Sequence, residues 1–85
     1  MKWTVRLLAS VRKTLDGMSG DLFDRMVRAL RRLEADPRHQ GAVRLSGSDD
    51  QWRVRVGDWR ILYSIRDREL VVLVIRIGHR REVYR

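Results

Sequence analysis

Two short segments of the chain carry the residues that could do chemistry. The first, Trp59-Arg60-Ile61-Leu62-Tyr63, holds an arginine between aromatic residues, and the second, Gly78-His79-Arg80-Arg81-Glu82-Val83-Tyr84-Arg85, adds more arginines, a histidine and a tyrosine. Arginine stays charged at physiological pH and binds phosphate through paired hydrogen bonds. The chain has no cysteine and only two histidines, so thiol chemistry is excluded and neither a metal nor another cofactor is expected. The pattern favours binding of a polyanion.

The charge and length of the chain set the class of protein. Nineteen basic residues, all arginines except Lys2 and Lys13, oppose eleven acidic ones and give a net charge of +8. This excess favours a nucleic-acid or acidic-protein partner without choosing between them. Residues 1–85 are predicted to form one small, marginally stable domain. Arg6 interrupts the N-terminal apolar residues and no run approaches the roughly 20 residues of a membrane span, so a cytoplasmic location is expected.

The N-terminal half is predicted to hold one strand and two helices. Alternating apolar residues indicate a strand over 3–8, and a short helix follows over 9–16. A longer amphipathic helix should begin near Asp21, whose carboxylate can accept hydrogen bonds from the first free amides, and should stop before Pro37. Its arginines are interpreted as a solvated face in preference to a nucleic-acid groove; they are Arg25, Arg28, Arg31 and Arg32.

The C-terminal half is predicted to be strands. A short strand over 43–45 precedes longer ones over 52–56, 59–65 and 70–77, and the near-continuous apolar run of the last indicates a central strand buried on both faces. The fold class is therefore α+β: two N-terminal helices packed on one face of a small, mostly antiparallel twisted sheet, in the order β-α-α-β-β-β-β.

The Gly57-Asp58 pair predicts a two-residue hairpin turn of type II′. That register assigns the tryptophans and other alternate residues to the core and places Arg55 opposite Arg60 on the outer face, beside Arg53 and Leu62. Like charges facing each other destabilise a sheet, so either Asp58 screens the pair or a bound phosphate or acidic partner segment relieves the repulsion. The next turn is expected to add an apolar strip to this face; its residues are Leu73, Ile75 and Ile77.

The order of residues 52–63 followed by the terminal GHRREVYR resembles the RelE/ParE superfamily of bacterial and archaeal toxins, and is most similar to its RelE branch. The resemblance covers nearly the whole chain from residue 3. It implies the same fold and the toxin of a type II toxin–antitoxin system, neutralised by a RelB-like antitoxin. It also implies a ribosome-dependent endoribonuclease, an mRNA interferase, in which the 2′-hydroxyl of an A-site nucleotide attacks the adjacent phosphate.

The resemblance assigns roles by matching motif positions. Arg60 matches the arginine of the aromatic-Arg-apolar-x-Tyr motif and is expected to clamp the phosphate. Arg80 follows the Gly-basic pair and is expected to clamp the phosphate or stabilise the leaving group. Tyr84 matches the terminal Glu-Val-Tyr and is expected to stack on or orient a base, with a packed C-terminal anchor as the alternative.

The proton-transfer residue is less clearly indicated. Arg53 and Arg55 stand where some relatives carry lysine, and because arginine effectively keeps its proton both are expected to act electrostatically. His79 is the conventional base near the motif, with a phosphate contact or simple packing as alternatives and Glu82 in reserve. Without a base, catalysis would rest on positioning and charge. Three further arginines are expected to contact the RNA backbone or rRNA: Arg44, Arg81 and Arg85.

Two other functions compete with the interferase. A ParE-like toxin shares the fold but inhibits DNA gyrase without enzymatic chemistry, and the terminal Glu-Val-Tyr together with the outer-face arginines argues against it. A plain RNA- or DNA-binding domain is disfavoured because the predicted sheet exposes no aromatic residues for stacking.

Overall fold

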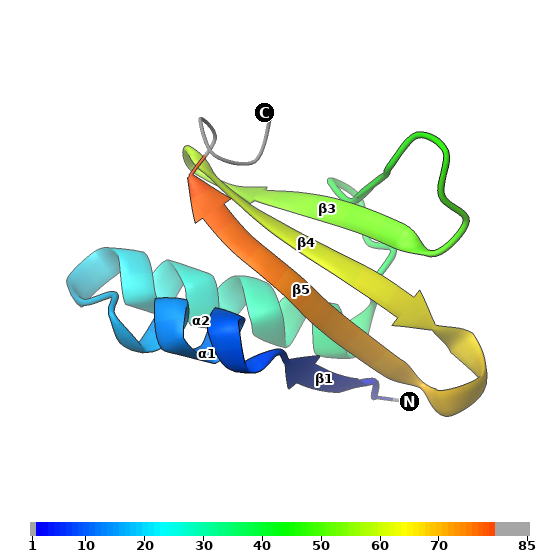
Figure 1. Ribbon diagram of the computed structural model, residues 1–85, viewed down its shortest axis with the longest axis horizontal. Coiled ribbons are helices and arrows are strands. Elements are labelled where there is room, and N and C mark those ends of the chain that lie inside the picture. The colour runs from blue at the N-terminus through cyan, green and yellow to red at the C-terminus, as the bar shows by residue number, and fades with distance from the viewer. Residues whose placement is uncertain (1, 80–85) are drawn as a thin grey trace.

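The computed structural model describes residues 2–79. A strand and two helices come first, followed by four strands with a short 3-10 turn before the last (Figure 1). The elements are β1 (Thr4–Leu7), α1 (Ala9–Asp16), α2 (Gly20–Ala35), β2 (Val43–Arg44), β3 (Gln51–Val56), β4 (Trp59–Arg66), η1 (Asp67–Glu69) and β5 (Val71–His79). The element order is the one that the sequence predicts.

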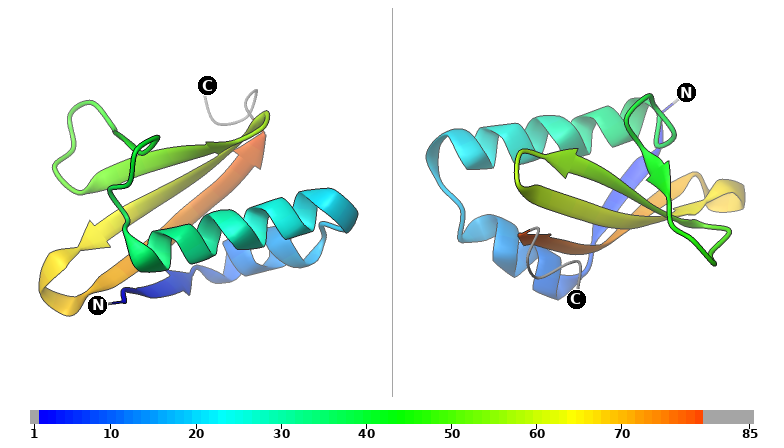
Figure 2. Two further views of the ribbon diagram at one scale, coloured as in Figure 1. Left: turned by 180° about the vertical axis from the view of Figure 1, so that it is seen from behind. Right: turned by 90° about the horizontal axis from the view of Figure 1, so that it is seen from above.

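The five strands form one sheet in the order β1-β5-β4-β3-β2. β1 runs parallel to β5, and the other neighbours are antiparallel. Both helices lie on one side of the sheet, and neither of them covers the other side (Figures 1 and 2). The predicted α+β class, with helices on one face of a mostly antiparallel sheet, is confirmed.

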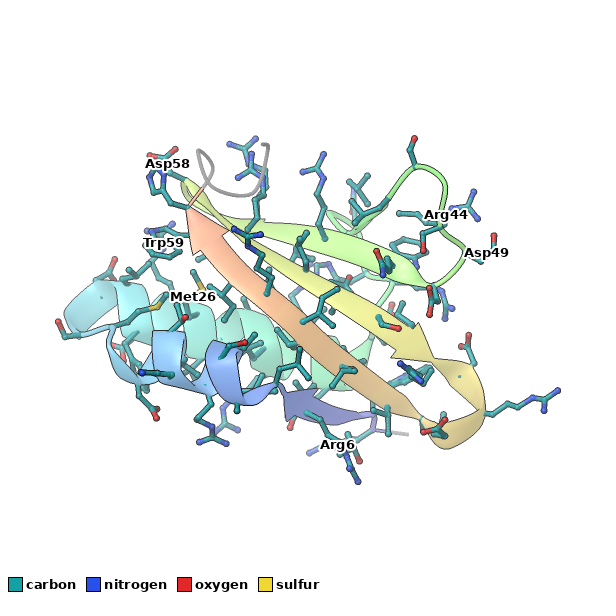
Figure 3. The ribbon with its side chains drawn as sticks, in the orientation of Figure 1. Arg6, Met26, Arg44, Asp49, Asp58 and Trp59 are labelled. Carbon is teal, nitrogen blue, oxygen red and sulfur yellow. The ribbon has the colours of Figure 1, made fainter. Side chains whose placement is uncertain are left out.

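α2 is held by its apolar stripe. Met26, Leu30 and Leu33 are buried, and Met26 points from the helix toward the sheet (Figure 3). The helix stops at Ala35 because Pro37 forces the preceding residue out of helical geometry. Its start differs from the prediction: Ser19 is the N-cap and makes no side-chain capping bond. The Asp21 carboxylate instead lies 3.9 Å from Nη1 of Arg25, one helical turn further on.

The β3–β4 hairpin has the predicted turn and register. Gly57 has φ +62°, and Leu70 is the one non-glycine residue with positive φ in the described part of the chain, so the φ signs match a type II′ turn. Arg55 pairs with Arg60 and Trp52 with Tyr63. The inward residues form the core; Val54, Val56, Ile61, Tyr63 and Ile65 are buried, and Trp52 and Trp59 pack against them.

β5 corrects two of the expectations. The register with β4 shifts between Leu62 and Tyr63, so that Leu62 pairs with Arg76 while Tyr63 pairs with Val74. This β-bulge turns Ile77 to the core face, where it is 6% exposed, and the prediction that it lies on the arginine face is wrong. The strand is central but not buried on both faces, because Leu73 and Ile75 are only half-buried.

A set of contacts ties the loop after α2 to the sheet. The buried Tyr63 hydroxyl donates to the Pro37 carbonyl oxygen at 2.6 Å. The Arg38 guanidinium donates two hydrogen bonds to the Asp67 carboxylate, at 3.0 and 2.9 Å, and lies 5.7 Å from the centre of the Trp52 ring. Burial raises the pKa of Tyr63 well above its ordinary value, and the hydrogen bond from Arg38 lowers the pKa of Asp67. These contacts hold the loop after α2 against the end of the β3–β4 hairpin that lies away from its turn.

Neither helix of residues 2–79 has the length and apolar character needed to cross a membrane.

Candidate phosphate-binding site

Four arginines from three adjacent strands share the outer face of the sheet. We call Arg53, Arg55, Arg60 and Arg76 the outer arginine cluster. In one row of the sheet Arg53 lies opposite Leu62, which lies opposite Arg76. In the next row Arg55 lies opposite Arg60, which lies opposite Gly78. The hairpin and the bulge therefore place these four arginine side chains in two neighbouring rows on the same face of the sheet.

Arg60 is the most enclosed member of this cluster. Only 5% of the residue is exposed, although the hairpin pattern places it on the outer face. Its Nη1 donates a hydrogen bond to the Trp59 carbonyl oxygen at 3.2 Å. A buried guanidinium is costly unless its donors are satisfied, so this position requires fixed partners. Such an arginine presents its charge in a defined geometry, whereas a long side chain in solvent must first be ordered.

The other three members differ in exposure. Arg53 is half-buried, and Arg55 and Arg76 are exposed. Arg76 was not among the predicted site residues, because period-two alternation from Leu70 assigns it to the inner face. The signal that could have found it is the charge itself: an arginine interrupting an apolar strand costs too much inside a core, and so indicates a bulge or an outward position.

His79 lies apart from the outer arginine cluster. It pairs with Trp59, and the two rings meet edge to face at 83° with their centres 5.7 Å apart. Because Gly78 pairs with Arg60, alternation places His79 on the opposite face from that arginine. This position favours the packing role among the predicted alternatives, and proton transfer by His79 stays a prediction.

The remaining predicted residues are not brought to the cluster. Arg44 is exposed on β2 opposite Trp52, at the other end of the sheet from Asp58 and Trp59 (Figure 3). The terminal residues lie outside the described part of the chain, and their expected roles stay predictions: Arg80, Arg81, Glu82, Tyr84 and Arg85. Residues 2–79 hold no group of three or more His, Asp or Glu side chains placed to bind a metal ion.

The cluster can stabilise negative charge that develops on a phosphate. Guanidinium groups give paired, directional hydrogen bonds to phosphate oxygens. Fixed donors aimed at developing charge are among the strongest contributions to catalysis of phosphate and acyl transfer. A two-helix, five-stranded α+β domain with such a basic outer face is suited to bind a phosphate backbone.

Comparison with known proteins identifies the family. The model of the ParE toxin of the type II toxin–antitoxin system, parDE, matches residues 2–84. The chain therefore belongs to the ParE toxin family, within the RelE/ParE superfamily of type II toxin–antitoxin toxins. It is also 28% identical over 86 residues to Toxin RelG of Mycobacterium tuberculosis, with 100% of this chain and 99% of that protein covered.

Solved structures agree on the fold. A chain of the archaeal RelE–RelB complex from Pyrococcus horikoshii superposes with a TM-score of 0.81 at 26% identity, covering 94% of this chain and 97% of that one. The M. tuberculosis toxin–antitoxin complex RelBE2 gives a TM-score of 0.80 at 24% identity, over 94% and 100% of the two chains. The isolated E. coli RelE toxin gives 0.81 at 22% identity, over 96% and 90%. The likenesses below 25% identity bear on the fold alone.

Proposed function

We propose that this toxin is a ribosome-dependent endoribonuclease that cleaves mRNA in the A site. In the reaction the 2′-oxygen forms a bond to the adjacent phosphorus and loses its proton. The bond from phosphorus to the 5′-oxygen breaks, and that oxygen takes up a proton. The products are a 2′,3′-cyclic phosphate and a free 5′-hydroxyl. A RelB-like antitoxin is the proposed neutralising partner, and the cytoplasm is the proposed site of action.

The observation that carries this proposal is the enclosed, backbone-held guanidinium of Arg60 at the centre of the outer arginine cluster. Phosphoryl transfer by this route builds charge on the phosphorane, and the largest benefit comes from a donor that is already oriented. Arg60 fits the role of phosphate clamp, with Arg53, Arg55 and Arg76 adding electrostatic support. Arg80 and Tyr84 retain their proposed roles in leaving-group stabilisation and base orientation.

One observation favours a second candidate. The matching family model is described as the ParE toxin of parDE, the branch to which the gyrase-inhibitor alternative belongs. Gyrase inhibition of that kind needs no oriented phosphate clamp, whereas cleavage does. The fate of Arg60 variants therefore separates the two functions.

The test compares Arg60→Lys and Arg60→Ala with Arg66→Ala, an arginine on the same strand that is exposed and lies opposite Val71. Cleavage of ribosome-bound mRNA should fall about 10²–10³-fold in both Arg60 variants, as for loss of one transition-state donor. The Arg66 variant should cleave at close to the parental rate. The lysine variant keeps the charge in case alanine disturbs folding, which circular dichroism checks. A parental protein that leaves mRNA intact but blocks DNA supercoiling by gyrase would establish the second candidate.

A further inference from the structure

A row of polar and apolar residues continues the outer face of the sheet beyond the outer arginine cluster. In this row Gln51 lies opposite Ser64, which lies opposite Leu73. Along β4, Leu62 stands two positions nearer the hairpin turn than Ser64, and Arg60 stands four positions nearer. The Gln51 row is therefore adjacent to the first row of arginines and about 13 Å along the strand from the row of Arg60.

The backbone of Gln51 is held by two hydrogen bonds, whereas its side-chain amide is open. The Gln51 N–H donates to Oγ of Ser48 at 3.2 Å, and its carbonyl oxygen accepts from the Leu45 N–H at 2.9 Å. Within residues 2–79 the side-chain amide makes no hydrogen bond, although the residue is half-buried. This amide offers an acceptor oxygen and an NH₂ donor side by side, on a backbone that is already fixed.

The Asp50 carboxylate is positioned beside this amide by two serine hydroxyls. Ser64 Oγ donates to Oδ2 of Asp50 at 3.0 Å, and Ser48 Oγ donates to Oδ1 at 3.2 Å. Because Ser64 lies opposite Gln51, the carboxylate is held on the same outer face. A carboxylate has about four acceptor sites, so these two bonds leave acceptors on an exposed residue. Gln51 and Asp50, which we call the outer polar pair, therefore present more acceptors than donors.

Charge changes sign along the outer face. The arginines occupy the rows nearer the hairpin turn at Asp58, whereas Asp49 and Asp50 are exposed at the other end of the sheet (Figure 3). A phosphate is attracted to the first end and repelled by the second, while a neutral base is not repelled. Leu62 and Leu73 lie between them, half-buried, and provide apolar contact for the face of a base. RNA held by its phosphates at the cluster therefore presents a base to the outer polar pair.

We propose that the outer polar pair reads one base of the mRNA and selects adenine or cytosine over uracil. The inference rests on the proposed function for the identity of the RNA and adds sequence specificity to it. Adenine and cytosine each carry an amino group beside a ring nitrogen that accepts hydrogen bonds. Gln51 accepts one amino hydrogen and donates to the ring nitrogen, as glutamine does with adenine, and Asp50 accepts the second amino hydrogen. Uracil places a carbonyl oxygen against these acceptors.

The distance from the proposed clamp indicates which base is read. The Gln51 row lies about 13 Å from the row of Arg60, which is further than the base of a nucleotide reaches from its own phosphate. The base therefore belongs to a neighbour of the cleaved nucleotide. Binding that neighbour positions the scissile phosphate over Arg60, so the outer polar pair acts on positioning and specificity and takes no part in the chemical step.

The test measures kcat/KM for cleavage of mRNA on programmed ribosomes, for the full chain and for Gln51→Met. Methionine keeps an unbranched side chain and removes the amide. The matched control is Gln40→Met, the same change at an exposed residue in the loop before β2. The messages differ by one amino-to-oxo change, adenine to hypoxanthine or cytosine to uracil, made in turn at each A-site and flanking nucleotide.

At one nucleotide position each amino-to-oxo change should lower the parental kcat/KM by about tenfold or more, as for loss of a bidentate base contact. In Gln51→Met the two messages of a pair should be cleaved within about threefold of each other, because the message with the amino group loses its advantage. Gln40→Met should discriminate like the parental chain. Circular dichroism confirms that both variants are folded.

Three results would overturn the inference and leave the nuclease function in place. The first is a parental chain that cleaves without discrimination at every position. The second is discrimination that survives in Gln51→Met. The third is an equal loss of cleavage on all messages in Gln51→Met, which would assign Gln51 a structural role.

A binding measurement decides the inference if the parental chain cleaves no mRNA and the proposed function fails. It compares the affinities of 2′-O-methyl oligocytidine and oligouridine for the parental chain, Gln51→Met and Gln40→Met. A parental preference for oligocytidine that disappears only in Gln51→Met would support base reading by the outer polar pair. Equal affinities of the two oligonucleotides for the parental chain would overturn it.

Discussion

Replacing Arg55 with glutamine should stabilise the free protein and weaken its binding to RNA. Arg55 and Arg60 are direct partners in the β3–β4 register, and only Arg60 is enclosed. Glutamine keeps a long polar side chain on the strand and removes the charge. The change therefore isolates the repulsion between the two guanidinium groups. This repulsion lowers the stability of the free protein, and we expect the pair to be kept because phosphate binding uses both charges.

The size of the effect follows from the geometry of an antiparallel pair. Facing Cβ atoms lie about 5 Å apart, and splayed guanidinium groups reach a separation of about 8 Å. Two unit charges at that distance repel by about 0.5 kcal/mol in water and about 2 kcal/mol at an effective dielectric constant of 20. Measured cross-strand pairs fall between about 0.2 and 1 kcal/mol. We expect a gain of about 0.5–1 kcal/mol, or about 2–8 °C in Tm for a domain of this size.

Thermal unfolding in low-salt buffer measures the gain in stability, and binding to mRNA-free ribosomes measures the loss of RNA affinity. Arg66→Gln is the matched control, because Arg66 is an exposed arginine opposite Val71 on the neighbouring strand. Its Tm should stay within about a degree, as for most surface substitutions. The gain at Arg55 should shrink as salt screens the pair. A lower Tm for Arg55→Gln, or an equal rise in the control, would refute the repulsion argument.

Three further substitutions test the fold and the site. Tyr63→Phe leaves the Pro37 carbonyl without its partner and should cost about 1–3 kcal/mol in urea unfolding. Because burial raises the pKa of Tyr63, the unfolded chain releases its proton first, so parental stability should fall as pH rises above about 10 and the Phe variant should lose that part of the fall. The hydrogen bond from Arg38 lowers the pKa of Asp67, so its stabilisation should disappear as pH falls below about 4, and Asp67→Asn should show a flatter acid profile in the same assay. Arg76→Gln, with folding confirmed by circular dichroism, should raise KM for ribosome-bound mRNA by up to about tenfold at 0.1 M salt; an unchanged KM would remove Arg76 from the outer arginine cluster's function.

The sequence predicts the hairpin and the helices well because their signals are local. Gly57-Asp58 sets the turn type, the turn sets the register, and the register places Arg55 opposite Arg60. Pro37 sets the end of α2 in the same direct way.

The bulge in β5 and the enclosure of Arg60 depend on tertiary contacts. A one-residue shift changes which face each side chain occupies, and no local motif in the apolar run of β5 specifies it. Ile77 and Arg76 consequently exchange the faces that simple alternation assigns to them. Alternation along β4 predicts that Arg60 faces outward, but only 5% of the residue is exposed. Exposure depends on which residues pack over the strand, and alternation does not report this. The closeness of the Arg25 guanidinium to Gly57 is likewise a product of tertiary packing, because the two residues lie far apart in the sequence.

The measurement that tests the central claim most directly is mapping of new 5′ ends by primer extension on a defined mRNA, with the purified toxin and with or without ribosomes. The account predicts new ends inside A-site codons that appear only with ribosomes and vanish for Arg60→Ala. Intact mRNA in both reactions, with folded protein confirmed by circular dichroism, would contradict the nuclease assignment and favour gyrase inhibition. Cleavage by Arg60→Ala at the parental rate would contradict the clamp itself.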